Sequence, residues 1–204
     1  AKAAAVGDDL VGITLARRDR EDHGADWLLL GAAVRTGDAG NGDDGEEGSE
    51  PVEAFRFEAW PTERRLITQP FGARPEYYAQ WQLPGHEGID IAADPGSQIF
   101  CVAAGEVYAV HGQDDGHVYG IHVRVQHEDG YRTVYAHLQE ARVVEGEEVA
   151  PGQLLGLAGM TGNTDGPHLH LTLKRDGRPD PGYPYDIVDP TPFLMPLLGE
   201  AWLD

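Results

Sequence analysis

The chain has 204 residues, which is enough for one well-packed domain and a small appendage. It carries 15 basic and 35 acidic residues, so its formal net charge is -20. Such a surface repels phosphate backbones and anionic membranes, which excludes general nucleic-acid binding. Apolar residues make up 41% of the chain, too many for a fully disordered protein.

The single cysteine, Cys101, excludes an internal disulfide and every zinc site built from several thiolates. Its apolar neighbours indicate a small buried side chain. No apolar stretch approaches the roughly 18 residues that a membrane-spanning helix needs. No signal peptide is recognisable in the sequence either. We therefore expect no membrane insertion by this segment.

Residues 1–60 are predicted to form an N-terminal β-strand extension. Two apolar runs, 10–16 and 27–34, are typical of strands. Residues 37–50 contain six acidic residues, five glycines and no large apolar residue, which predicts an acidic disordered loop. Residues 53–60 alternate apolar and polar side chains, so we expect a half-exposed strand that pairs with residues 27–34.

From residue 61 to residue 195, short runs rich in Val, Ile, Leu and Tyr alternate with Gly and Pro, and we expect one domain here. The Asp129-Gly130 pair between two such runs is a strong hairpin signal. Only residues 75–82 suggest a helical period. The predicted fold class is therefore all-β or β-rich, followed by a C-terminal tail at 196–204.

Eight of the nine histidines lie between residues 86 and 170. Histidine is the commonest metal ligand and transfers protons near neutral pH. The first motif, Pro84-Gly-His86-Glu-Gly-Ile-Asp90, has a proline and two glycines that favour a turn leading into a strand. One imidazole and one carboxylate suit Zn²⁺, although this spacing is also common by chance.

The second motif is His168-Leu169-His170. On a strand, residues i and i+2 point to the same face, about 6.6 Å apart. The leucines that alternate with them form the opposite, core-facing side, so the two histidines and Thr172 face outward. The alternative interpretation is that both histidines are ordinary surface residues with no role in metal binding. In the metal interpretation, one ring binds the ion and the other lies beside its open coordination position.

The third motif places His137 at the end of the strand-like run 131–135, where a lone histidine is more often structural. Taken together, His86, Asp90 and His170 provide three protein ligands and leave a fourth position for water, the pattern of catalytic zinc. His137 and His168 then remain as unligated imidazoles that can take a proton from water and return it to a leaving amine.

In this order, the motifs at 86–90, 135–138 and 159–170 resemble peptidase family M23, the lysostaphin- and LytM-like peptidoglycan endopeptidases. The resemblance runs from about Ile67 to Leu194 and includes Phe71-Gly-Ala-Arg74. It implies an antiparallel β-sheet core whose loops wall a groove. It also implies one Zn²⁺ per chain on His86, Asp90 and His170, with His137 and His168 as the catalytic pair.

The resemblance further implies a substrate, a peptide cross-link of peptidoglycan, and therefore a secreted, periplasmic or envelope location. The bond is either glycyl-glycine or a D-amino-acid cross-link. We expect a monomer. Thr164-Asp165-Gly166 stands where the family usually has Ser-Thr-Gly, which places a negative charge near the groove.

Two other functions are open at this point. A catalytically inactive LytM-like regulator or binding module of cell-wall hydrolases typically lacks zinc ligands or catalytic histidines, whereas this chain keeps all five positions. The second is a non-enzymatic carrier domain, because residues 145–156 resemble the turn motif of biotinyl and lipoyl carriers. It needs a lysine at a hairpin tip, and neither Lys2 nor Lys174 lies in one.

Several further side chains are candidates for substrate contact. Tyr77 and Tyr78 are candidates to hydrogen-bond an oxyanion, as a tyrosine does in some related enzymes, with core packing as the alternative for Tyr78. His122 is a candidate to face the groove. His111 and His117 bracket a polar loop that is expected to form a groove wall.

Overall fold

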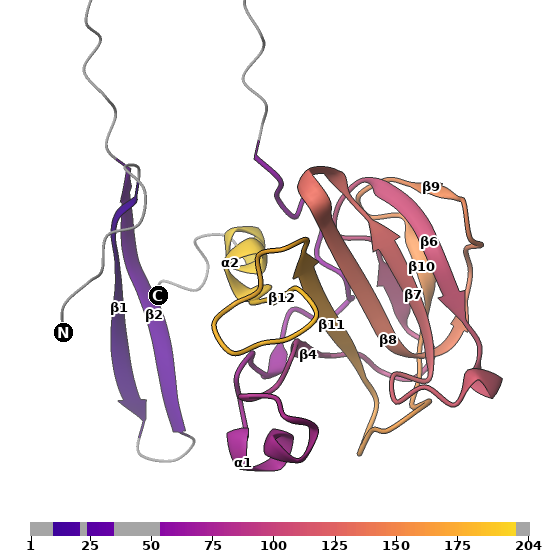
Figure 1. Cartoon of the computed structure of the whole chain (residues 1–204), viewed down its shortest axis with the longest axis horizontal. Coiled ribbons are helices and arrows are strands. Elements are labelled where there is room, and N and C mark those ends of the chain that lie inside the picture. The colour runs from indigo at the N-terminus through magenta and orange to yellow at the C-terminus, as the bar shows by residue number, and fades with distance from the viewer. Residues whose placement is uncertain (1–9, 21–23, 35–53, 199–204) are drawn as a thin grey trace, which may run out of the picture. The chain divides into compact units, whose positions relative to one another are not determined.

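The computed structural model describes residues 10–20, 24–34 and 54–198, and the chain divides into two units, Ala1–Pro51 and Val52–Asp204. In the first unit, β1 (Leu10–Arg20) and β2 (Gly24–Val34) form a two-stranded antiparallel sheet (Figure 1). The predicted pairing of 27–34 with 53–60 is therefore wrong. Pairing two strands that are adjacent in sequence costs less loop-closure entropy than pairing strands separated by a long loop. The acidic loop predicted at 37–50 lies outside the described residues.

Residues 54–60 form an extended segment of the second unit rather than a strand. The alternation read from the sequence is real, because Phe55, Phe57 and Trp60 are buried while most of their neighbours are exposed. Phe55 stacks on Tyr131 with ring centroids 4.2 Å apart. The segment thus contributes aromatic side chains to the core of this unit, although the predicted domain boundary followed residue 60.

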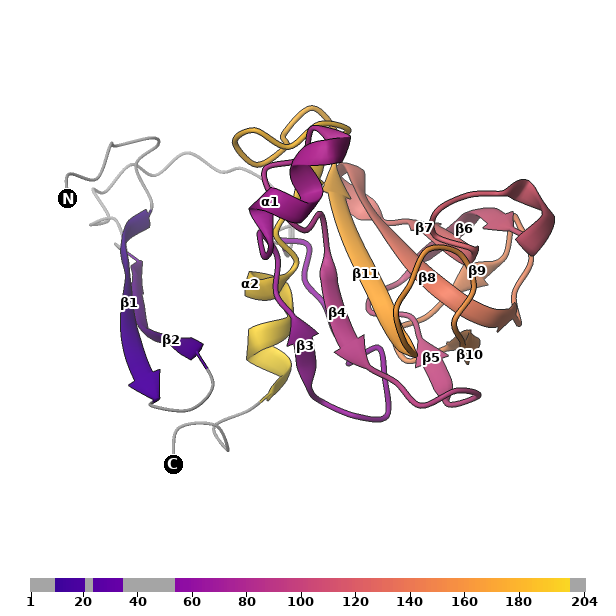
Figure 2. The ribbon, with the colours of Figure 1, turned by 90° about the horizontal axis from the view of Figure 1, so that it is seen from below.

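The second unit is built on a ten-stranded sheet in which every pairing is antiparallel. Its main path runs β3-β4-β11-β8-β7-β6-β9 (Figure 2), and β5, β10 and β12 pair beside this path. The strands are β3 (Ile67–Gln69), β4 (Ile89–Ala92), β5 (Gln98–Phe100), β6 (Gly105–His111), β7 (Ile121–Gln126), β8 (Tyr131–Ala141), β9 (Glu148–Val149), β10 (Leu154–Ala158), β11 (His168–Arg175) and β12 (Ile187–Val188).

The helices of the described chain are all short. They are α1 (Pro75–Tyr78), α2 (Thr191–Leu194) and the 3₁₀ helices η1 (Ala79–Trp81), η2 (Gln113–Asp115), η3 (Glu128–Gly130) and η4 (Met195–Leu198). None in the described part is long and apolar enough to cross a membrane. The β-rich fold class predicted from the sequence is confirmed. The predicted tail begins within η4, and residues 199–204 lie outside the described part.

Local sequence explains the central strands. Asp129 and Gly130 adopt φ angles of 54° and 72°, the left-handed conformation that an Asp-Gly hairpin requires between β7 and β8. Along β11 the leucines are completely buried against the core. The opposite face of β11, with His168, His170 and Thr172, is thereby turned away from this core, as predicted.

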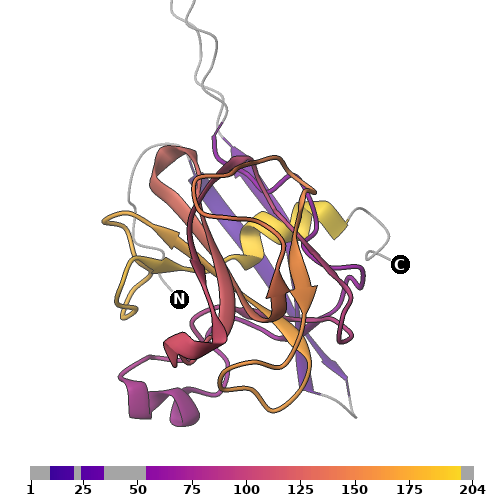
Figure 3. The same ribbon diagram turned by 90° about the vertical axis from the view of Figure 1, so that its right-hand side faces the viewer.

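Three connections lie at the same end of the sheet: the α1–η1 segment, the β6–β7 connection and the β10–β11 connection (Figures 1 and 3). Each contributes side chains to one pocket with a volume of about 610 Å³. The strands β4, β8 and β11 supply further residues of the same pocket. This end of the sheet therefore holds the candidate site.

Candidate metal centre and active site

Strand register brings the first two candidate ligands together. β4 and β11 pair antiparallel with Asp90 directly opposite His170. His86 lies in the turn that precedes β4, and the backbone fixes it there. The His86 carbonyl accepts a hydrogen bond from Gly72 N–H at 2.9 Å, and the His86 N–H donates to Ala73 O at 2.9 Å. The turn predicted around His86 is thus folded onto the chain segment that follows β3.

Two glycines permit this close packing. A Cβ atom at Gly85 would lie 2.4 Å from Gly72 O, and one at Gly88 would lie 2.5 Å from Leu171 O. Both distances are shorter than any ordinary contact, so a larger residue would push the turn away from β11. The glycines of the first motif are therefore needed for the approach of His86 to His170.

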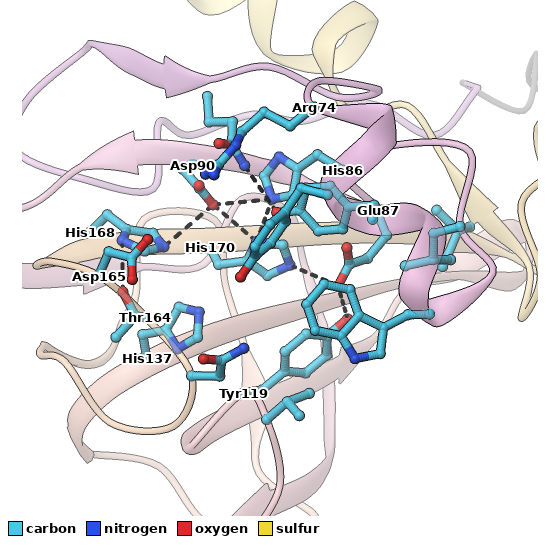
Figure 4. A pocket seen from close by; sticks show the side chains of 18 of the residues that line it. Arg74, His86, Glu87, Asp90, Tyr119, His137, Thr164, Asp165, His168 and His170 are labelled. Carbon is cyan, nitrogen blue, oxygen red and sulfur yellow. Dashed lines mark hydrogen bonds and ion pairs between the residues drawn. The ribbon is translucent and has the colours of Figure 1, made fainter.

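Three ligand atoms meet in the pocket (Figure 4). His86 Nε2 lies 3.0 Å from His170 Nδ1, and Asp90 Oδ1 lies 3.3 Å and 3.0 Å from these two nitrogens. Tetrahedral zinc, with bonds of about 2.0–2.1 Å, holds its ligand atoms about 3.3 Å apart. The three atoms are thus spaced to hold one ion, and they form the one such group among the described residues.

The second nitrogen of each ring supports this assignment. His86 Nδ1 lies 3.3 Å from Pro70 O, and His170 Nε2 lies 3.0 Å from Thr172 Oγ1. A proton on each of these atoms leaves His86 Nε2 and His170 Nδ1 as lone pairs that face each other. Both rings are almost fully buried, at 1% and 4% exposure. The two facing lone pairs repel each other, and a cation bound between them would remove this repulsion. The three ligand atoms therefore fit a metal ion.

The Asp90 carboxylate is suited to the same role. Burial opposes its ionisation, but in the metal-free protein the rings of His170 and His86 can turn a proton toward Asp90, and these hydrogen bonds outweigh burial and hold the pKa of Asp90 below its ordinary value. Asp90 therefore stays ionised at neutral pH. Two neutral imidazoles and one carboxylate would leave a bound Zn²⁺ with a net positive charge.

Behind His170, a row of hydrogen bonds ends on a second carboxylate. Thr172 accepts from His170, Tyr119 hydrogen-bonds with Thr172, and the Tyr119 hydroxyl donates to Glu87 Oε1 at 3.3 Å. Burial, followed by the charge of Glu87, raises the pKa of Tyr119, so this hydroxyl keeps its proton. Neither Tyr119 nor Glu87 was expected from the sequence. The one available signal was the position of Glu87 next to His86.

The remaining two histidines lie beside the ligand atoms, with ring centroids 4.9 Å apart. His168 Nδ1 donates to Gly166 O at 2.9 Å, and His137 Nδ1 donates to Thr161 O at 2.8 Å. Each ring therefore has Nε2 free to accept a proton, and His168 Nε2 lies 3.4 Å from Asp90 Oδ1.

The surroundings of His137 keep its ring neutral. Burial, followed by the neighbouring His170, lowers the pKa of His137 to about 4. Its backbone is left-handed, with φ at 61°, a conformation uncommon for non-glycine residues and frequent at functional sites. All five side chains predicted from the sequence line this one pocket.

Of the other side chains predicted to contact substrate or to form the groove wall, some line the pocket and others do not. Tyr77 and Tyr78 both line the pocket, and the Tyr78 hydroxyl accepts a hydrogen bond from Gln69 at 3.0 Å rather than packing in the core. His117 lines the pocket as part of a wall, whereas His111 does not. The groove-facing position predicted for His122 is wrong. Its ring is fully buried behind the wall and accepts a hydrogen bond from Arg124 Nε at 3.1 Å.

Comparison with known proteins agrees with this geometry. Residues 84–181, which contain all five candidate side chains, match peptidase family M23. The chain carries a domain of this family. The chain is 36% identical over 150 residues to the DD-carboxypeptidase/endopeptidase Mpg of Neisseria meningitidis serogroup B, which covers 73% of this chain and 33% of Mpg.

Two further similar proteins come from Vibrio cholerae. The peptidoglycan DD-endopeptidase ShyA is 34% identical over 125 residues, which covers 60% of this chain and 28% of ShyA. The crystal structure of a zinc-containing peptidase superposes with a TM-score of 0.54 at 30% identity, covering 66% of this chain and 41% of that one. The M23 chain described here thus spans about a third of the length of the curated relatives it matches.

Proposed function

We propose that this chain is a zinc-dependent endopeptidase that hydrolyses peptide cross-links of bacterial peptidoglycan. The observation that carries the proposal is the convergence of three ligand atoms, 3.0–3.3 Å apart, beside two imidazoles with free Nε2 atoms. The names of Mpg and ShyA support the reaction, and that of ShyA supports the substrate class. A substrate of this kind places the site of action outside the cytoplasm.

In this proposal, His86, Asp90 and His170 hold one zinc ion per chain. The ion supplies a Lewis acid that lowers the pKa of a water molecule and polarises the scissile carbonyl. The protein's part is to keep both imidazole ligands in the tautomer that presents a lone pair. Pro70 O and Thr172 Oγ1 do this from the far side of each ring.

The proton transfers belong to His137 and His168. Each has Nδ1–H bonded to a backbone carbonyl, so Nε2 can accept the proton of the attacking water and return it to the leaving amine. Asp90 Oδ1, near His168 Nε2, stabilises the imidazolium that results. One histidine acts as the base, and the other, once it carries a proton on Nε2, stabilises the negative charge that develops on the carbonyl oxygen.

The test compares metal content with hydrolysis in single variants. We expect His170→Ala to lose bound zinc and activity together, because a ligand is removed. His137→Ala should keep zinc and lose hydrolysis by about 10²-fold or more, the usual contribution of a proton-transfer group. Zinc is measured by elemental analysis, and fragments of purified peptidoglycan are measured by mass spectrometry.

His111→Ala is the matched control, because His111 lies outside the pocket and should keep both properties. Wild-type protein that binds no zinc after metal removal and refilling would contradict the metal assignment. Undiminished hydrolysis by His137→Ala would contradict the catalytic role of that side chain. The mass of the fragments also identifies the bond that is cleaved.

A further inference from the structure

The groove face of the sheet continues beyond the metal centre. β11, β8 and β7 lie side by side. After His170, the next residues on the same face of β11 are Thr172, which is fully buried, and Lys174. Thr172 is opposite Val134 of β8, and Val134 is in turn opposite Arg124 of β7. Arg124 and Lys174 therefore emerge on the face that carries the candidate ligands, and both line the same pocket as His170.

These two cations differ from their neighbour Arg132 in having no ion-pair partner. Arg132 pairs with Asp176 and Asp186. Within residues 54–198, no carboxylate lies within ion-pair distance of either Arg124 or Lys174. Arg124 instead donates Nε–H to His122 Nε2, and Lys174 Nζ lies 5.9 Å from the centre of the Tyr185 ring. Both groups thus retain unused hydrogen-bond donors.

Their environment makes this arrangement costly without a partner. Burial, followed by the charge of Arg124, lowers the pKa of Lys174, so the two like charges disfavour each other in a partly desolvated position. Asp186 and Glu87 attract Lys174 from beyond ion-pair distance, and their effect on its pKa is smaller than that of burial and Arg124. An anion that enters the pocket would relieve the repulsion and satisfy the free donors.

We infer that Arg124 and Lys174 form a subsite that binds a free carboxylate of the peptide substrate. The inference rests on the proposed function, because the pocket that holds the pair is the one that holds the candidate metal ligands. Lys174 is four residues from His170 along β11, or about 13 Å at 3.3 Å per residue. The carboxylate would therefore belong to a residue within about four positions of the scissile bond.

Binding, rather than turnover, tests the subsite. Alanine peptides of roughly two to five residues are prepared both as free acids and as C-terminal amides. They are titrated into the full chain in a metal chelator, so that no hydrolysis occurs, and affinity is measured by calorimetry. For at least one length, we expect the free acid to bind about tenfold more tightly than the amide, as for a charge-assisted hydrogen bond.

Single variants assign the effect to the two side chains. Arg124→Gln and Lys174→Gln should each reduce the preference for the acid to about twofold or less, while Lys174→Arg should retain it. Arg142→Gln removes the same charge from an exposed side chain that pairs with Glu140 outside the pocket, and it should also retain the preference. Thermal unfolding confirms that each variant is folded.

Equal affinity for acids and amides of every length in the wild type would overturn the inference. So would a preference that survives in both glutamine variants. Inorganic phosphate is titrated in the same way to test a different anion. If phosphate bound more tightly than any free acid, the carboxylate assignment would be contradicted. A wild type that prefers acids but hydrolyses no peptidoglycan counts against the proposed function and not against the subsite.

Discussion

For each candidate histidine ligand, the hydrogen-bond partner of the second ring nitrogen fixes which nitrogen carries the proton and which presents a lone pair to the metal. His170 Nε2 is held by Thr172, and Thr172 connects through Tyr119 to Glu87. This row of donors ends on a carboxylate, so every hydroxyl in it has a defined direction. As a result, the lone pair of His170 points toward His86 and Asp90.

Thr172→Val tests this row of hydrogen bonds. Valine has nearly the shape of threonine but cannot accept the proton of His170 Nε2, so the ring loses its fixed tautomer. We expect zinc affinity to fall by about 10- to 100-fold, the usual effect of removing such a partner. Affinity is measured by competition with a chelator. Thr172→Ser is the control and should stay near the wild type, and unchanged affinity in Thr172→Val would contradict the role of the hydroxyl.

At the scale of elements, the site depends on the close contact between the turn before β4 and strand β11. The register places Asp90 beside His170, and Gly88 lets the turn approach β11. The sequence predicted most of these strands, including the β7–β8 hairpin, because their alternation and turn residues are local signals. It gave the wrong partner for residues 27–34, because strand pairing depends on contacts between distant segments.

Gly88→Ala tests the contact between the turn and β11. The new Cβ would lie 2.5 Å from Leu171 O and 2.9 Å from His170 Cε1, so both the backbone and a ligand ring must move. We expect a loss of about 1–3 kcal/mol in the free energy of unfolding, together with weaker zinc binding. Denaturant unfolding and chelator competition measure the two effects.

Gly112→Ala is the matched control for this variant. A Cβ at Gly112 would meet no atom within 4 Å, and its φ of -84° suits any residue. Its stability should stay within about 0.5 kcal/mol of the wild type. Equal stability and zinc affinity in the two alanine variants would show that the turn is not tightly packed on β11.

At the scale of the whole molecule, charge and buried histidines govern the response to pH. The net charge of -20 is spread over a protein whose pocket nonetheless presents Arg124 and Lys174. Burial lowers the pKa of His122 to about 4 and also lowers that of His127. The unfolded chain therefore binds protons at these rings at higher pH than the folded chain does.

This difference predicts a loss of stability in mild acid. The stabilisation linked to His122 is complete above its unfolded pKa of about 6.5 and is lost as the pH falls toward about 4. Between about pH 7.5 and about pH 5, we expect His122 to account for a decrease of about 2 kcal/mol in the free energy of unfolding. Urea unfolding of the metal-free chain across this range measures it.

His122→Gln provides the comparison. Glutamine does not titrate, so the variant should show a shallower decrease in stability over the same range, whatever its stability at neutral pH. Parallel stability curves for the wild type and His122→Gln would contradict the lowered pKa of this ring. Because His122 lies outside the pocket, the comparison does not depend on metal binding.

The sequence by itself determined the β-rich class, the hairpin at Asp129-Gly130 and the five candidate side chains of the pocket, because alternation, turn residues and motif spacing are local properties. The tertiary structure decided what distant segments do together. It placed Phe55 and its neighbours in the second unit and buried His122 behind the pocket wall. It also brought Glu87, Tyr119 and Thr172 behind His170, and it placed Arg124 and Lys174 in one pocket. These contacts join residues on different strands and loops, and the register of the sheet sets their distances.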